Sequence, residues 1–143
     1  MSKKIIIGSD HAGFTLKNSL FNYLREQGFD ISDAGTHSED SCDYPIIAKD
    51  VANKIVNGDY DMGILVCGTG IGMSIAANKV KGVRAAVVSD TCSAKLSRQH
   101  NNANILCIGS RIVGESLAKD IVDIWLFTDF AGERHQRRVS MIE

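Results

Sequence analysis

Short apolar runs alternate along the chain with longer segments in which apolar residues recur every three or four positions. The short runs predict five buried strands, at residues 4–7, 29–32, 61–67, 83–88 and 104–108. Strands that alternate with helices need crossover connections, which give a parallel sheet covered by helices on both faces. The pattern therefore predicts the α/β class: a single-domain three-layer α/β/α sandwich over residues 1–143, with a five-stranded parallel, Rossmann-like sheet.

The helices are marked by apolar stripes and by residues that favour helix ends. Leu16, Leu20 and Leu24 form the first stripe, and Gly28 is suited to end that helix. Pro45 is well placed in the first turn of the second helix. Two further stripes consist of Ile47, Val51 and Ile55 and of Leu117, Ile121 and Trp125. Helices are also predicted from the glycine-rich segment through about Asn78, over residues 91–99 and over residues 132–143.

Composition excludes several classes of protein. The 143 residues are 44% hydrophobic and 23% charged with a net charge of −1, which is globular composition without a basic field for nucleic acid or an anionic membrane. No apolar run approaches the roughly 20 residues of a membrane helix, and the apolar core of the first ten residues is too short for a secretion signal. Four separate cysteines without a CxxC pair indicate reduced thiols and a cytoplasmic protein.

Ligands bind such sheets at the carboxyl ends of the strands. Polar residues follow four of the five predicted strands directly, so we expect an acid, an imidazole, a thiol and a guanidinium to share one edge of the sheet. These residues are Ser9, Asp10 and His11; Cys67 and the glycine-rich segment behind it; Ser89 and Asp90; and Ser110 and Arg111.

Cys67 ends the strongest predicted strand and precedes the segment Gly68-Thr69-Gly70-Ile71-Gly72, which leads into a helix. The amides of such a turn and the helix dipole stabilise negative charge and favour the thiolate form. The alternative is that Cys67 is a small buried core residue. Chemistry is the favoured interpretation, because core packing does not require three glycines beside a thiol. Cys42, Cys92 and Cys107 lack such a context and are interpreted as packing residues.

The glycine-rich segment also imitates a dinucleotide-binding fingerprint, with Asp90 twenty residues beyond Gly70. The imitation fails at the third glycine position, which is Met73. It also follows the third strand, whereas the fingerprint belongs to the first strand–helix turn. Dinucleotide binding is therefore disfavoured.

Two further groups leave alternatives open. Asp10 is either a cap of the first helix or an acid at the ligand edge, and the two roles are compatible. Arg134 and Arg138, four positions apart, share a helix face and either clamp a phosphate or belong to a solvated basic tail. His37 stands alone in a polar loop and is assigned no role.

His100 lies at the far end of a predicted helix that runs back toward the opposite edge of the sheet. A helix of eleven residues spans about 16 Å, so His100 is not expected to reach Cys67 of its own chain. Either it is structural, with Asn101 and Asn102 ending the helix, or it completes the site of a neighbouring chain across a dimer interface.

Taken together, the ordered motifs resemble those of type B ribose-5-phosphate isomerases, from Lys4 into the final helix. The wider family includes galactose-6-phosphate isomerase subunits and allose-6-phosphate isomerases. The motifs are Gly8-Ser9-Asp10-His11, Asp43-Tyr44-Pro45, Cys67-Gly68-Thr69-Gly70-Ile71-Gly72, Ser74-Ile75-Ala76-Ala77-Asn78-Lys79, Arg98-Gln99-His100-Asn101, Gly109-Ser110-Arg111 and Arg134-His135.

The resemblance implies an aldose–ketose isomerase that interconverts D-ribose 5-phosphate and D-ribulose 5-phosphate in the non-oxidative pentose phosphate pathway. It implies a cis-enediolate intermediate and neither metal nor organic cofactor. Cys67 would be the base between C2 and C1, and Met73 replaces the glutamate of the family's other branch. His100 would open the sugar ring from the partner subunit with help from Asp10, and Thr69 would relay a proton.

The same resemblance implies how the substrate is bound, in a homodimer or tetramer with sites shared between chains. The amides of Gly68, Thr69, Gly70, Ile71 and Gly72 would hold the enediolate oxygen. The implied phosphate ligands are His11, Arg111, Arg134 and Arg138, and the implied sugar contacts are Asn101 and Tyr44. Two alternatives stay open: an isomerase for a six-carbon sugar phosphate (allose or galactose 6-phosphate), and a non-catalytic nucleotide-binding module.

Overall fold

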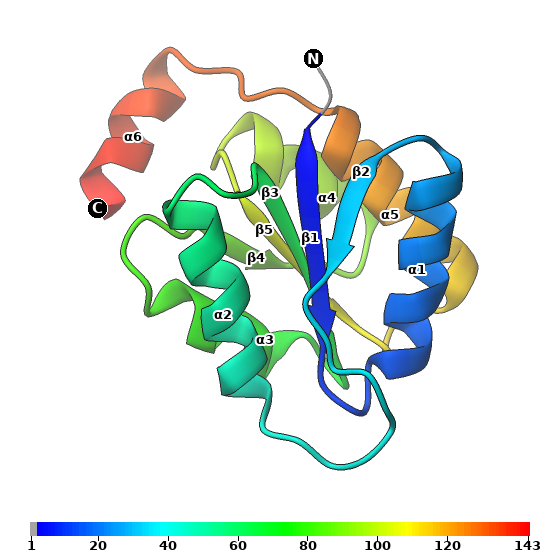
Figure 1. Cartoon of the computed structure of the whole chain (residues 1–143). Helices are drawn as coiled ribbons and strands as arrows, with labels where there is room; N and C mark the ends of the chain where they lie inside the picture. The colour runs from blue at the N-terminus through cyan, green and yellow to red at the C-terminus, as the bar shows by residue number, and fades with distance from the viewer. Residues whose placement is uncertain (1–2) are drawn as a thin grey trace.

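The computed structural model describes residues 3–143 and contains one parallel sheet flanked by helices (Figure 1). The strands are β1 (Lys4–Ser9), β2 (Asp30–Asp33), β3 (Met62–Cys67), β4 (Ala85–Val87) and β5 (Ile105–Gly109). The helices are α1 (Phe14–Glu26), α2 (Tyr44–Val56), α3 (Ile71–Asn78), α4 (Thr91–Gln99), α5 (Glu115–Phe127) and α6 (Arg134–Ile142).

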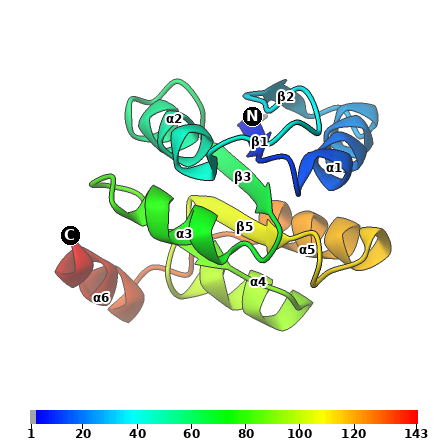
Figure 2. The same cartoon turned by 90° about the horizontal axis from the view of Figure 1, so that it is seen from below.

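The strand order is β2-β1-β3-β5-β4, and all neighbours are parallel. Viewed from below, α2 and α3 cover one face of the sheet, whereas α1, α4 and α5 cover the other (Figure 2). The predicted three-layer α/β/α sandwich with a five-stranded parallel sheet is therefore confirmed. None of the helices within residues 3–143 has the length and apolar character needed to cross a membrane.

The core consists of two apolar layers, one on each face of the sheet. Ile5, Ile6 and Ile7 of β1 are at most 1% exposed, because this strand is central and covered on both sides. Trp125 of α5 is fully buried in the layer that α1 and α5 share. This packing holds the carboxyl ends of β1, β3 and β5 side by side, in register at Ser9 with Val66 and at Cys67 with Gly109.

Two sequence predictions are wrong in detail. β4 begins at Ala85 rather than at Val83, because the amide of Val83 closes a turn onto Val80 O and the amide of Arg84 donates to the Asn104 side chain. Leu117 is 39% exposed and Ala118 takes its place in the core stripe of α5, whereas Ile121 and Trp125 are buried as predicted.

Lys17 of α1 is fully buried and joins this helix to the segment behind β2. Its Nζ donates to both oxygens of Asp33, at 2.9 and 2.8 Å, and to Thr36 O at 2.7 Å. The backbone of Gly35 and Thr36 in turn forms hydrogen bonds with Ser9, at 2.7 and 2.8 Å. Lys17 therefore braces the segment that leads from β1 into the candidate site.

We expect Lys17→Met to lower the free energy of unfolding by about 3 kcal/mol, because it leaves the Asp33 carboxylate without its cation in a largely buried position. Urea unfolding followed by circular dichroism measures this effect as a lower midpoint with an unchanged m value. The double variant Lys17→Met/Asp33→Asn is the control and should recover part of the loss. A single variant as stable as the unmodified protein would contradict the bracing role.

Candidate active site

The segment after β3 folds tightly around the sulfur of Cys67. The side chain of Cys67 is 5% exposed, and the amide of Gly70 donates a hydrogen bond to its Sγ at 3.1 Å. Gly70 has a φ of +80°, and a Cβ there would lie 2.9 Å from Val87 Cγ2 and 3.0 Å from the carbonyl carbon of Ile108. Only glycine fits this position, and this backbone conformation aims its amide at the sulfur.

Side chains from two other elements close on the glycine-rich segment. The guanidinium of Arg111 lies against Gly68, where an added Cβ would come within 3.4 Å of Nη1. The ring of Tyr44 lies against Gly72, where a Cβ would come within 2.7 Å of ring carbons. The amide of Arg111 also donates to Gly68 O at 3.0 Å. A cation and a phenol therefore flank the backbone amides that follow the thiol.

Asp10 and His11 reach the same edge from β1. The amide of Asp10 donates to Val66 O at 3.2 Å, which joins the two strand ends. Its carboxylate is 7% exposed and accepts a hydrogen bond from the Gly13 amide at 3.0 Å. Gly13 itself occupies the N-cap position of α1. The hydrogen bond to Asp10 therefore stabilises the turn before α1, and Asp10 does not cap the helix.

The orientation of His11 depends on a contact that the sequence did not reveal. The amide of Cys42 donates to His11 Nδ1 at 3.2 Å, so the neutral imidazole carries its proton on Nε2. That nitrogen is then a hydrogen-bond donor for an anion. Cys42 was predicted to be a packing residue, and it acts here through its backbone, which no side-chain pattern can signal.

The other predicted site residues lie at the opposite end of the sheet. His100 and Asn101 follow α4, where the carbonyl of Asn102 accepts a hydrogen bond from Arg84 Nε at 2.9 Å, just before β4 begins. The imidazole of His100 stacks on that of His135, with ring centroids 4.3 Å apart and planes 14° from parallel. Because His135 belongs to α6, this stack places α6 beside His100.

The predicted residues therefore form two groups within one chain. The cysteine group consists of Asp10, His11, Tyr44, Cys67, Gly68, Thr69, Gly70, Ile71, Gly72 and Arg111. The histidine group consists of His100, Asn101, Arg134 and Arg138. A six-residue strand such as β3 is about 20 Å long, so the two groups belong to opposite ends of the sheet.

His135 lies among positively charged side chains of the histidine group. Loss of hydration lowers the pKa of His135, and the positive charges of His100, Arg134 and Arg138 lower it further. A neutral His135 therefore stacks on His100 without adding another charge to this cationic surface. Among the described residues, no group of three or more His, Cys, Asp or Glu side chains is arranged to hold a metal ion.

The remaining cysteines differ from one another. Burial raises the pKa of the Cys107 thiol, and the neighbouring charge of Cys67 raises it further, so Cys107 stays a neutral packing residue as predicted. Cys92 is exposed, and its assignment to packing is wrong. The buried side of α4 is formed instead by Ala94, Ser97 and Arg98, which turns Cys92 toward solvent.

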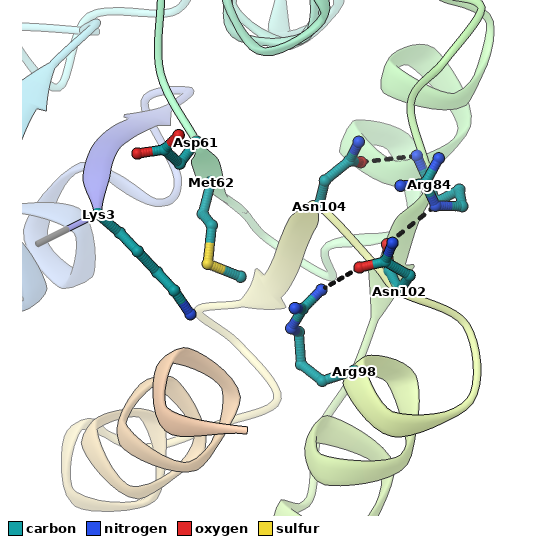
Figure 3. Close-up of a pocket in the computed structure, with 7 residues that line it drawn as sticks. All are labelled: Lys3, Asp61, Met62, Arg84, Arg98, Asn102 and Asn104. Atoms are coloured by element: carbon teal, nitrogen blue, oxygen red, sulfur yellow. Dashed lines mark hydrogen bonds between the residues drawn. The ribbon is translucent and has the colours of Figure 1, made fainter. Parts of the chain in front are cut away.

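Two of the hollows at the surface lie near residues of the candidate site or of the opposite end of the sheet. One of about 300 Å³ lies beside Thr69 and is lined mainly by apolar side chains, among them Ile71, Val87 and Ile112. Another of about 460 Å³ lies at the amino end of the sheet, between Lys3, Arg84 and Arg98 (Figure 3). Only the first adjoins the glycine-rich segment, so the second is not the place where a substrate meets Cys67.

Known proteins are similar to this chain in fold and in sequence over nearly its whole length. The family model for ribose/galactose isomerases matches residues 5–142. Ribose-5-phosphate isomerase B of Escherichia coli is 53% identical over 140 residues, which cover 98% of this chain and 94% of the relative. A ribose 5-phosphate isomerase structure from Thermotoga maritima superposes with a TM-score of 0.97 at 51% identity and covers 99% of this chain and 98% of its own.

A third relative was solved with a sugar phosphate. The Mycoplasma genitalium ribose-5-phosphate isomerase B, with bound ribulose-5-phosphate, has a TM-score of 0.94 at 49% identity and covers 99% of this chain and 95% of its own. The chain belongs to the ribose/galactose isomerase family. Within that family it is one of the type B ribose-5-phosphate isomerases.

Proposed function

We propose that Cys67 is the catalytic base of this enzyme, which interconverts D-ribose 5-phosphate and D-ribulose 5-phosphate. The main observation behind the proposal is the position of the thiol. It lies at the carboxyl end of β3 and accepts a hydrogen bond from the Gly70 amide, and Arg111 and Tyr44 flank the segment that follows it. Family membership establishes the reaction, and this geometry supports Cys67 as the base.

The reaction begins with the closed ring of ribose 5-phosphate. His100 of the partner subunit and Asp10 transfer the protons that open the ring to the aldehyde. The Cys67 thiolate then removes the proton from C2, and the electron pair forms the C1–C2 double bond of the cis-enediolate. Thr69 relays a proton between the two oxygens. The Cys67 thiol finally returns its proton to C1, which leaves the ketone at C2.

The developing negative charge is stabilised by fixed donors. The backbone amides of residues 68–72 precede and begin α3, where the partial positive charge of the helix end adds to their effect. His11 Nε2 and the Arg111 guanidinium bind the phosphate from the same chain. Arg134 and Arg138 bind it from the partner, and Tyr44 and Asn101 contact the sugar hydroxyls.

The separation of the two groups supports a homodimer with shared sites. Neither group contains both the base and the ring-opening histidine, and His100 is exposed at the surface of its own chain. Large apolar side chains are exposed on the two helices that follow this edge of the sheet: Ile46 of α2 and Ile71 and Ile75 of α3 are 69, 53 and 58% exposed. A second copy of the chain would cover this surface and bring its histidine group to Cys67.

We place the enzyme in the cytoplasm. All four cysteines are free, and the proposed catalytic base must stay reduced to act as a thiolate. A reducing compartment supplies that condition.

Proton NMR in heavy water tests the activity directly, with ribose 5-phosphate and allose 6-phosphate incubated in parallel with the enzyme. We expect ribulose 5-phosphate to form and deuterium to enter at the carbon that is reprotonated, because the proton held by the Cys67 thiol exchanges with solvent while the enediolate is bound. Turnover of the six-carbon sugar alone would keep the mechanism and change the substrate. No turnover of either sugar phosphate would contradict catalysis and favour a binding module.

A further inference from the structure

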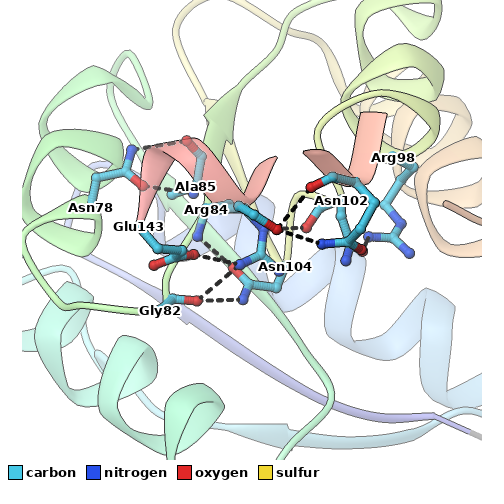
Figure 4. A network of polar contacts seen from close by, with 10 residues as sticks. Asn78, Gly82, Arg84, Ala85, Arg98, Asn102, Asn104 and Glu143 are labelled. Atoms are coloured by element: carbon cyan, nitrogen blue, oxygen red, sulfur yellow. Dashed lines mark hydrogen bonds and ion pairs between the residues drawn. The ribbon is translucent and has the colours of Figure 1, made fainter. Parts of the chain in front are cut away.

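Arg98 connects the turn that carries His100 with the segment that leads to α6. Its contact with Asn102 is drawn in Figure 4. Its Nη1 donates to Asn102 Oδ1 at 3.0 Å and to Ala103 O at 2.7 Å. Its Nε donates in another direction, to Thr128 O at 3.1 Å. Residue 128 follows α5 and begins the segment that ends at Arg134, so one side chain joins both halves of the histidine group.

The turn is also held from its other side. Arg84 Nε donates to the carbonyl of Asn102 at 2.9 Å, and Arg84 Nη1 forms an ion pair with Glu143 at 3.0 Å. Asn102 has a φ of +48°, the left-handed conformation that ends a helix and that asparagine tolerates. Asn102 is therefore fixed through both its side chain and its backbone, two residues after His100.

The environment of Arg98 indicates a geometric role rather than an ion pair. The residue is 8% exposed, and within residues 3–143 no carboxylate oxygen lies within 4.0 Å of its guanidinium. Its donors instead reach two carbonyls and one amide oxygen, which belong to two segments, residues 102–103 and residue 128. A planar guanidinium can satisfy three such acceptors at once, whereas a lysine ammonium at the end of a flexible stem cannot hold the same fork.

We propose that Arg98 is a positioning residue, which fixes His100 relative to Arg134 and Arg138 so that all three enter the partner's site together. The inference rests on the proposed role of the histidine group. A second link, from the Ala131 amide to Gln99 O at 3.0 Å, remains when Arg98 is replaced. Loss of the guanidinium therefore loosens the spacing between His100 and α6 without releasing α6.

The variants Arg98→Lys and Arg98→Met test this role. The cavity of about 460 Å³ beside Arg98 admits water, so the shorter or uncharged side chain leaves no closed void. We expect kcat/KM to fall about tenfold for the lysine variant and about 30-fold for the methionine variant, since a small misplacement of catalytic groups is costly. Asn102→Gly keeps the left-handed turn and removes the side-chain acceptor, and it should also lower kcat/KM. Arg25→Lys, at an exposed position of α1, is the matched control and should leave kcat/KM unchanged.

A mixing experiment separates positioning from general destabilisation. The defect of Arg98→Lys belongs to the histidine group, so mixed dimers with Cys67→Ala chains should regain one intact site. Dimers with His100→Ala chains should regain none, because both defects then lie in the same group.

Recovery with both partners, or with neither while Cys67→Ala and His100→Ala chains restore each other, would overturn the role of Arg98. A lack of recovery between Cys67→Ala and His100→Ala chains would overturn the shared site, and the role of Arg98 with it. Subunit exchange is verified beforehand by mass spectrometry of chains that carry distinct isotope labels.

Discussion

Replacement of Cys67 by serine is expected to lower kcat for ribose 5-phosphate by about 10³-fold, with KM changed by less than about threefold. A neutral hydroxyl is a far weaker base than a thiolate, so proton removal from C2 slows. The proposed phosphate ligands His11 and Arg111 are unchanged in this variant, so binding should be retained. Formation of ribulose 5-phosphate, followed by its carbonyl absorbance, measures the effect.

Two further variants make this expectation specific to Cys67. Cys67→Ala removes any base and should abolish turnover while inorganic phosphate still binds. Cys92→Ser changes an exposed thiol on α4 and should leave kcat unaltered. A Cys67→Ser enzyme that retains a tenth or more of the unmodified kcat would show that the thiol is a packing residue and that another group moves the proton.

The cysteine group could be predicted from sequence because its determinants are local. Cys67 and the glycines behind it stand in one continuous segment, and the parallel sheet places Asp10 and Arg111 at the same edge. Gly70 shows why the pattern is specific: its φ of +80° and its contacts with Val87 and Ile108 exclude any side chain. A physical requirement of this kind leaves a signature in the sequence itself.

Other features had no such signature. The orientation of His11 depends on the amide of Cys42, and every residue except proline has an amide. The position of Leu117 was mistaken because neighbouring stripes of α5 both contain apolar residues, and packing alone selects Ala118. Arg98 resembled an ordinary helical cation, since its acceptors at residues 102, 103 and 128 meet only in the folded chain.

For the histidine group, the sequence and the structure support the same conclusion, that His100 does not act on Cys67 of its own chain. The direction of α4 had already indicated that His100 lies far from its own Cys67. The structure adds that His100 stacks on His135, so that Arg134 and Arg138 of α6 accompany it. In the proposed dimer, one partner chain would therefore supply the ring-opening histidine together with Arg134 and Arg138.

His100→Ala is accordingly expected to lower kcat/KM for ribose 5-phosphate by about 10²-fold, because ring opening loses its acid–base group. His37→Ala, which removes an exposed imidazole outside both groups, is the matched control and should leave kcat/KM unchanged. A His100→Ala enzyme with unchanged kcat/KM would exclude His100 from the reaction, wherever the residue lies.

The location of His100 in the assembly has an independent consequence, which single variants cannot show. Inactive Cys67→Ala chains and His100→Ala chains carry their defects in different groups. Random exchange makes half of the dimers mixed, and each mixed dimer has one site with an intact base and an intact histidine. Activity should therefore return to about a quarter of the unmodified value per chain. If each site were built from one chain, both sites of every mixed dimer would carry a defect, and activity would stay at the level of the separate variants.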